Sequence, residues 1–536
     1  PYKNHASARS TTQTPKPSQA SLTPSPASSS SSPPSRMAQF GGFGGWSAMD
    51  VAAAAAAALG NVSGAVYHAD PAAAVYASLV PGMAVVPGRA PPSAVQIEAA
   101  RRWKELEKMA LRSVNLMVTC AGAIQAGDYA AAAGSLSDAR EIFAKMPTTR
   151  TGIGRVLTHF ADALAERLYP AFPQSAPPPP PPRGEQRELF RGFYEAGPYL
   201  KFAHLAANQA ILEAFEGCNS VHVIDIALSD GIQRPARIQA VAVRPGGPPF
   251  LRITGIGPHA AGNRDALRDV GLRLAEFARS CSVPFAFRGI AADQLDGLRP
   301  WMFQVAPGEA VAINSVLQLH RLLVDQDAAA AASFPAPIDG VLDWVASMNP
   351  RVFTVVEQEA DHNKSSLLER FTNSLFYYAS MFDSLEAISR HGGGDGAGNP
   401  LAEAYLQGEI ADIVSREGSS RVERHEQMPR WVERLRRGGM TQLPLGATSL
   451  WQAAMQLREF SGAGFGVQEN GGFLTLTWHS QRLYSASAWR ATAGKKMTMM
   501  ASGAADAMEE SQNSNTNGGG GGSSGGGHGA LNQIMQ

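Results

Sequence analysis

Apolar residues recur along this chain with two periods, one typical of helices and one typical of strands. Residues 96–126 carry charged and apolar positions at helical spacing, and residues 129–145 continue this pattern. Between residues 153 and 168, and again from 202 to 215, apolar side chains return every three or four positions, which favours one buried helix face. The first half of the ordered chain is therefore predicted to be helical.

After residue 220 short apolar runs alternate with helical stretches. Residues 221–257 are predicted to form strand, turn, helix and second strand, one right-handed βαβ unit. The later strands are predicted at 285–289, 310–314 and 352–356, with helices at 267–277, 338–348 and 364–385 between or after them. This alternation predicts an α/β fold with a Rossmann-like, methyltransferase-like sheet core and an N-terminal helical cap.

The remaining chain is predicted to add helices and a group of closing strands. Helical spacing returns at 401–416, 429–437 and 449–460, after a glycine-rich loop at 392–398. Three strand candidates follow, joined by short turns of which the first is Asn470-Gly471. They lie at 466–468, 473–478 and 483–489.

Composition separates two tails from the ordered region. Residues 1–95 are rich in Ser, Pro, Ala and Gly, have no acidic residue before Asp50, and are predicted to be disordered. Residues 491–536 form a Gly- and Ser-rich tail for which we expect the same. Because the composition changes at Met37, we expect residues 1–36 to lie upstream of the natural start. The ordered part divides into a helical cap at about 99–216 and an α/β core at about 217–490.

Charge and cysteine content limit the functions that are possible. Lys+Arg and Asp+Glu both total 46, so no general positive field favours direct, sequence-specific DNA binding. The three cysteines, Cys120, Cys218 and Cys281, lack metal-ligand spacing, and neither a disulfide nor a zinc site is expected. The longest apolar runs fall well short of the roughly 20 residues that cross a bilayer, so no membrane span is predicted.

The turn that would bind a cofactor in a Rossmann-like enzyme has the wrong composition. Residues 227–231 contain a single glycine, Gly231, where a dinucleotide or S-adenosylmethionine site needs several. The second strand ends Thr254-Gly255-Ile256-Gly257, without the acidic residue that binds ribose hydroxyls. Asp225 at the end of the first strand is expected to cap the turn that follows. We therefore predict no cofactor and no catalytic residue.

A dense group of ionisable residues follows the strand at 352–356. Glu357, Glu359, Asp361 and His362 lie where α/β sheets bind ligands, and a carboxylate and histidine metal site is one interpretation. Residues along a strand alternate in direction, however, so the three acids need not share a face with His362. Structural hydrogen bonding or a partner contact is the favoured interpretation, and no metal site is predicted.

Leu319, Leu322 and Leu323 fit the LxxLL spacing that places leucines on one helix face, able to dock in an apolar groove. For an isolated match, a buried helix face after the strand at 310–314 is the favoured interpretation.

These landmarks together resemble the GRAS family of plant transcriptional regulators, over roughly residues 99–490. The helical block at 113–170 resembles the first leucine-rich region of that family, and residues 267–323 resemble the second. The remaining motifs occur in the family's order. They are the VHIID core (Val221, His222, Val223, Ile224, Asp225), the PFYRE elements (Pro350, Phe376, Tyr377, Arg416, Glu417) and the SAW signature (Ser487, Ala488, Trp489).

Within the family, residues 193–204 and 355–363 are similar to the DELLA subgroup, the repressors of gibberellin responses. Neither a DELLA string nor a TVHYNP-like string occurs before Ala99, so the chain resembles a slender-like relative without those receptor-binding segments. The resemblance implies a nuclear, non-enzymatic co-regulator that binds DNA-bound transcription factors through its GRAS domain. It also implies repression of gibberellin-responsive growth genes without destruction through the gibberellin receptor. An S-adenosylmethionine-type enzyme and a non-transcriptional scaffold are the alternatives.

Three positions depart from the family pattern. Arg234 replaces an aromatic residue, and Arg237 replaces an apolar one on the same predicted helix. Guanidinium groups facing a sheet either extend to solvent or weaken the domain. Gly122 replaces a common glutamate and adds helix flexibility.

Overall fold

The fold is taken from a computed structural model of the chain. It describes residues 94–145, 152–169, 183–226, 228, 234–258, 266–325, 335–392, 398–460 and 464–492. The predicted N-terminal arm up to residue 93, the tail beyond 492 and most of the turn at 227–231 lie outside the described residues.

The N-terminal region contains the four predicted helices and one that was not predicted. They are α3 (Ala94–Ala126), α4 (Tyr129–Lys145), α5 (Gly152–Leu168), α6 (Arg183–Ala196) and α7 (Tyr199–Ala214). Helix α5 shows the clearest sequence pattern, because its apolar positions from Val156 to Leu164 are buried on one face. Helix α6 was not predicted, since its sequence is mostly charged. Its Phe193 ring instead stacks on Tyr405, with ring centroids 4.6 Å apart, so a tertiary contact buries it.

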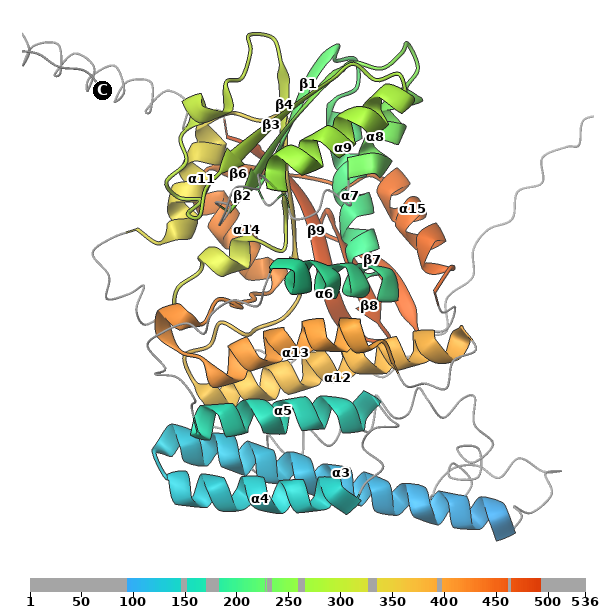
Figure 1. Cartoon of the computed structure of the whole chain (residues 1–536), viewed down its shortest axis with the longest axis vertical. Helices are drawn as coiled ribbons and strands as arrows, with labels where there is room; N and C mark the ends of the chain where they lie inside the picture. The colour runs from blue at the N-terminus through green and yellow to red at the C-terminus, as the bar shows by residue number, and fades with distance from the viewer. Residues whose placement is uncertain are drawn as a thin grey trace, which may run out of the picture. The chain divides into compact units, whose positions relative to one another are not determined.

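One mixed sheet forms the α/β core among the described residues (Figure 1). Its parallel half has the order β3-β2-β1-β4-β5, and β9, β8 and β7 continue it in antiparallel fashion. The order reverses between β1 and β4, the switch point typical of Rossmann-like folds. The strands are β1 (Ser220–Asp225), β2 (Phe250–Gly257), β3 (Phe285–Ala291), β4 (Ala310–Val316), β5 (Val352–Gln358), β7 (Phe465–Asn470), β8 (Phe473–Trp478) and β9 (Gln481–Ala491). The predicted α/β class and βαβ unit are confirmed.

Both faces of the parallel sheet are buried at β1, β2, β4 and β5, which explains why these strands are largely apolar, whereas the edge strand β3 is only partly buried. Val221 and Val223 contribute to one core with α7, while Ile224 and Phe353 contribute to a second core on the opposite face. The first core also contains side chains of α8 (Arg234–Ala242), α9 (Ala266–Ser280) and α15 (Ala447–Leu457). The second contains side chains of α11 (Pro337–Ser347) and α14 (Met428–Arg437).

The helical layer is built from two separate parts of the sequence. Helices α12 (Leu367–His391) and α13 (Pro400–Ser415), which follow β5, pack against α5, and α12 also contacts α3, β8 and β9 (Figure 1). Ser366 begins α12 by accepting a hydrogen bond from the Glu369 N–H, and Asn399 caps α13 in the same way. Helices α3 and α5 therefore meet the sheet through a layer supplied by the C-terminal half, whereas α7 packs on the sheet directly.

One strand of the sheet was not predicted from the sequence. Strand β6 (Met440–Leu443) is only four residues long and pairs with β9, next to the pairing of β9 with β5. A run this short carries too little periodicity to be recognised.

The longest helices of the described chain contain too many charged or polar residues to cross a membrane.

Candidate functional site

A buried segment of charged residues lies at the carboxyl ends of the central strands. Residues 421–426, with the sequence RVERHE, belong to no helix or strand and follow the short 3-10 turn Gly418–Ser420. Every residue of this segment except Val422 is buried. Ionisable side chains are rarely buried unless they are paired, so each one requires a partner inside the protein. We call residues 421–426 the charged segment.

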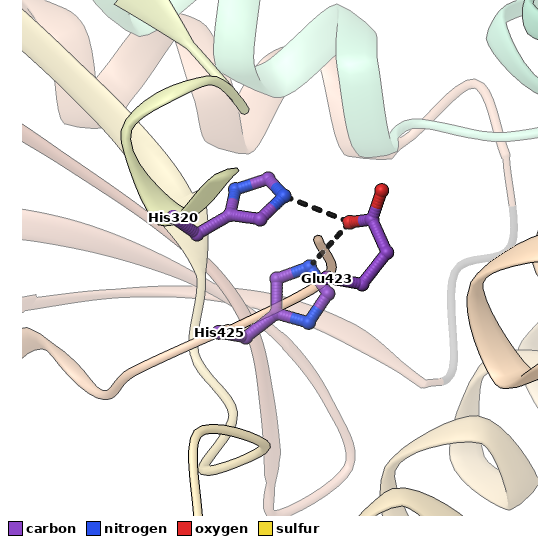
Figure 2. Close-up of side chains that lie close together, drawn as sticks. All are labelled: His320, Glu423 and His425. Atoms are coloured by element: carbon purple, nitrogen blue, oxygen red, sulfur yellow. Dashed lines mark hydrogen bonds and ion pairs between the residues drawn. The ribbon is translucent and has the colours of Figure 1, made fainter. Parts of the chain in front are cut away.

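His320 is held between two carboxylates, one from β5 and one from the charged segment. Its Nδ1 lies 2.6 Å from Glu357 Oε2, and its Nε2 lies 2.8 Å from Glu423 Oε2 (Figure 2). Glu357 also accepts hydrogen bonds from the N–H groups of Gln318 and Leu319, which fixes the turn that carries the histidine. All three side chains of this histidine–carboxylate group are almost completely buried.

The two carboxylates determine the charge of His320. Burial by itself opposes the imidazolium, but Glu357 and Glu423 outweigh it and raise the pKa of His320 to about 9. For Glu423, burial favours the neutral acid, while the charges of Arg321 and His320 hold its pKa well below the usual range. The site therefore contains a charged imidazolium and a charged carboxylate in direct contact.

His425 and His362 extend this group. The Nε2 of His425 lies 3.4 Å from Glu423 Oε2, too far for a hydrogen bond of normal length, and it makes no other hydrogen bond (Figure 2). The Nδ1 atoms of His425 and His362 lie 3.0 Å apart, so one ring donates to the other. Burial and the charge of His320 lower the pKa of His425, and burial and His425 lower that of His362. Both rings are therefore neutral beside the charged His320.

The charged segment also binds the loop after β4. Arg421 and Arg424 both pair with Asp325, and Arg424 does so through two nitrogens at 2.7 and 3.1 Å. Arg421 donates in addition to the His362 carbonyl at 2.9 Å. Two buried guanidinium groups thus share one carboxylate.

Two further contacts attach the segment to the helices around it. Glu426 accepts two hydrogen bonds of 2.8 Å from Arg434 on α14, and one of 2.9 Å from Asn363. The N–H groups of Val422 and Glu423 donate to Asp412 on α13. Residues 421–426 therefore connect β4, β5, α13 and α14, and hold the helical layer on the sheet.

The ionisable residues between 357 and 362, at the end of β5, make contacts in different places. Glu357 binds His320, His362 contacts His425, and Glu359 accepts a hydrogen bond from Met428 N–H at the start of α14. The favoured interpretation of structural hydrogen bonding agrees with these contacts, and the four residues do not form one site by themselves. Sequence analysis did not select His320, Glu423 or His425. The signal that was available is the density of ionisable residues in RVERHE, five in six positions.

The VHIID residues form the central strand of the parallel sheet. Val221, Val223 and Ile224 are completely buried, and Asp225 accepts a 2.9 Å hydrogen bond from Asn314, its pairing partner on β4. His222 Nε2 lies 2.7 Å from the Thr254 hydroxyl on β2. Most of the turn that Asp225 was expected to cap lies outside the described residues.

His222 is expected to make the protein sensitive to acid. Burial and the neighbouring Arg252 lower its pKa from 6.5 to about 4, so between these values the unfolded chain binds more protons than the folded protein. The contribution of this residue to stability should be present above pH 6.5 and should fall by about 3 kcal/mol as the pH approaches 4. Urea unfolding of the native chain and His222→Gln across this range checks the prediction. The variant should lose less stability on acidification, whereas the exposed control His391→Gln should behave like the native chain.

The LxxLL leucines pack inside the protein. Leu319 and Leu323 are buried in the core that contains α11 and α14, and Leu322 is half-buried against it. The motif forms a single 3-10 turn, Leu319–Leu322, instead of an α-helix. In this fold the three leucines stabilise the turn that carries His320, and docking in a partner groove would require that turn to open.

The PFYRE and SAW residues make structural contacts in separate places. Tyr377 donates to the Leu483 carbonyl at 2.8 Å, Glu417 pairs with Arg370 and Arg167, and Arg416 pairs with Asp412. Phe376 is half-buried, and Pro350 is buried just before β5. Trp489 donates from its indole nitrogen to Ser487, and Ser487 donates to Val355 on the adjacent strand β5. Ala488 is buried on β9.

Arg237 does not extend to solvent. It is completely buried, and its Nε donates to Asn208 on α7 at 2.9 Å. The expected extension to solvent is therefore wrong for Arg237, and its burial is accompanied by a hydrogen bond. The side chain of Arg234 lies outside the described residues.

The protein is an α/β protein in which a buried charged segment joins a Rossmann-like sheet to a helical layer. Comparison with known proteins shows the family to which it belongs. The GRAS domain family matches residues 113–490, and the chain belongs to this family. Its sequence and fold thus identify a regulator of plant transcription related to the DELLA proteins.

The relatives are slender-like and DELLA proteins. The protein SLENDER RICE1-LIKE 2 of Oryza sativa subsp. japonica is 98% identical over 500 residues, which cover 93% of this chain and all of that protein. SLENDER RICE1-LIKE 1 from the same plant is 55% identical, over 81% of this chain and 85% of its own length. The DELLA protein GAI of Solanum lycopersicum is 42% identical over 72% of this chain and 65% of that protein. The crystal structure of SCL7 from Oryza sativa matches with a TM-score of 0.59 and 31% identity, over 70% of this chain and 99% of the SCL7 chain.

Proposed function

We propose that this protein is a nuclear transcriptional co-regulator that represses gibberellin-responsive growth genes by binding DNA-bound transcription factors. The observation that carries the proposal is the GRAS match over residues 113–490 together with 42% identity to a DELLA protein. The balance of 46 basic and 46 acidic residues supports recruitment through partner proteins instead of direct DNA binding.

The packing at the switch point supports a regulator over an S-adenosylmethionine-type enzyme. Leu228, in the turn after β1, is buried, and its N–H donates to the Ile256 carbonyl on β2 at 2.8 Å. Its side chain lies directly over Gly255, where an added Cβ would come within 2.2 Å of Leu228 Cδ2. The glycine therefore serves to admit a leucine side chain at the strand end where nucleotide-binding relatives of this fold place their ligand.

Hormone behaviour is the second part of the proposal. The sequence before residue 99 contains neither a DELLA string nor a TVHYNP-like string, the segments by which the DELLA subgroup engages the gibberellin receptor. A repressor without them should persist when the hormone removes DELLA proteins.

The experiment compares this protein with the rice DELLA protein SLR1, a relative that is 40% identical. Both are expressed at equal levels in rice protoplasts with a reporter driven by a gibberellin-responsive growth promoter, and gibberellin is added. We expect both to lower reporter output before treatment. After treatment SLR1 should disappear, while this protein and its repression should remain.

Proteasome inhibition is the control that makes the result decisive. Proteasome inhibition should restore SLR1 and leave the level of this protein unchanged. Rapid proteasome-dependent loss of this protein after gibberellin would contradict the hormone-independent part, and unchanged reporter output at full protein level would contradict repression.

A further inference from the structure

We propose that His320, His425 and Glu423 form a binding site for one zinc ion, at the junction between the charged segment and the carboxyl ends of β4 and β5. This site goes beyond the proposed transcriptional role. It also departs from the sequence-based expectation of no metal, which rested on the cysteines and on the residues after β5.

The three side chains converge from two elements that lie far apart in the sequence. Figure 2 shows both imidazole rings directed at the same carboxylate oxygen of Glu423. The three ligand atoms all lie within 4.8 Å of one another. Two histidine nitrogens and one glutamate oxygen are an established ligand set for zinc.

The separations suit a small cation after a minor adjustment. Ligands at zinc distances of about 2.0–2.1 Å stand roughly 3.3 Å apart around a tetrahedral ion. The His425 Nε2 to Glu423 Oε2 separation of 3.4 Å already fits. The His320 Nε2 to Glu423 Oε2 separation of 2.8 Å is a hydrogen bond that must open by a few tenths of an ångström when zinc replaces its proton.

The outer contacts are those that a zinc-binding histidine requires. Metal-bound histidines usually donate their second N–H to a carboxylate or another acceptor, which orients the ring. His320 Nδ1 is bonded to Glu357, and His425 Nδ1 lies 3.0 Å from His362 Nδ1. When His425 donates from Nδ1 to His362, its own Nε2 carries a free lone pair directed at the site.

An independent observation points to a missing ligand. Among the described residues, the buried Nε2 of His425 has no hydrogen-bond partner and faces only Glu423 Oε2, at 3.4 Å. An unsatisfied buried ring nitrogen is unfavourable, and a bound cation would satisfy it. Zinc would also attach the charged segment to the turn after β4 by coordinate bonds, so it should act as a structural ion.

The test uses the full-length, untagged chain, stripped with a chelator and then titrated with Zn²⁺ or with Co²⁺ as a visible probe. We expect one ion per chain, the visible absorption of tetrahedral Co²⁺, and a melting temperature raised by about 5 °C when zinc is about a hundredfold above its Kd. His425→Gln should lower the affinity at least tenfold and lose the Co²⁺ spectrum. His391→Gln, which alters an exposed histidine, should bind like the native chain.

The native chain alone can overturn the proposal, whatever the variants do. If the stripped native chain neither binds zinc stoichiometrically nor shows a higher melting temperature with zinc, the three side chains form only hydrogen bonds and ion pairs with one another. Equal binding by His425→Gln, folded as judged by circular dichroism, would place the ion elsewhere and also overturn the assignment.

Discussion

Replacement of Glu423 by alanine should lower the free energy of unfolding by about 3–5 kcal/mol, because it leaves a buried imidazolium and a guanidinium without their shared carboxylate. Glu423 is almost completely buried and accepts from His320 Nε2 at 2.8 Å and from Arg321. Opposite charges taken out of water are tolerated only when each keeps its partner. Urea unfolding with a chelator present measures the ionic contacts without any metal contribution.

The chain offers a matched control at an exposed ion pair. Glu433 and Arg437 lie 3.6 Å apart on α14, with their side chains about two-thirds exposed, at 68% and 67%. An ion pair in water contributes little, so Glu433→Ala should change stability by less than about 1 kcal/mol. Equal losses in Glu423→Ala and Glu433→Ala would contradict the role assigned to the charged segment.

Replacement of Trp489 by alanine should cost about 3–5 kcal/mol, because it empties a large volume between β9 and α14. Trp489 is completely buried in the same core as Trp431 and Leu435, and its indole N–H donates to Ser487 at 2.9 Å. The SAW signature is thus explained as packing at the point where the parallel half of the sheet joins its antiparallel half. Thermal unfolding of the purified variant should show a lower midpoint with the same cooperative transition.

Trp451 is the matched control for the same substitution. Its side chain on α15 is exposed, at 63%, and it should be replaceable by alanine with a change within about 0.5 kcal/mol. A loss of stability in Trp451→Ala as large as in Trp489→Ala would show that burial does not explain the SAW position.

The fold was largely predictable because its elements follow simple periods. Strands β1, β2, β4 and β5 are buried on both faces and appear in the sequence as largely apolar runs, and α5 shows a regular apolar face. Helix α6 and strand β6 were not predicted, since one is stabilised by aromatic stacking on α13 and the other by pairing with β9. Both depend on residues distant in sequence, which local patterns do not contain.

The candidate site was predictable only in part. Glu357 and His362 drew notice because they follow a buried strand, where α/β folds bind ligands. His320 was hidden within the LxxLL motif, and Glu423 and His425 within a charged run that is typical of a solvent-exposed segment. Partners more than a hundred residues apart, such as His320 and Glu423, become visible only when the fold brings them together.

The central claim is that this protein is a transcriptional regulator that acts through its GRAS domain. The most direct test tethers the full chain to a promoter through a heterologous DNA-binding domain and measures reporter transcription. The native chain and Trp451→Ala should both lower output severalfold, while Trp489→Ala, compared at matched protein level, should lower it much less. No change in output from the stable native chain would contradict the account and favour a scaffold or an enzyme.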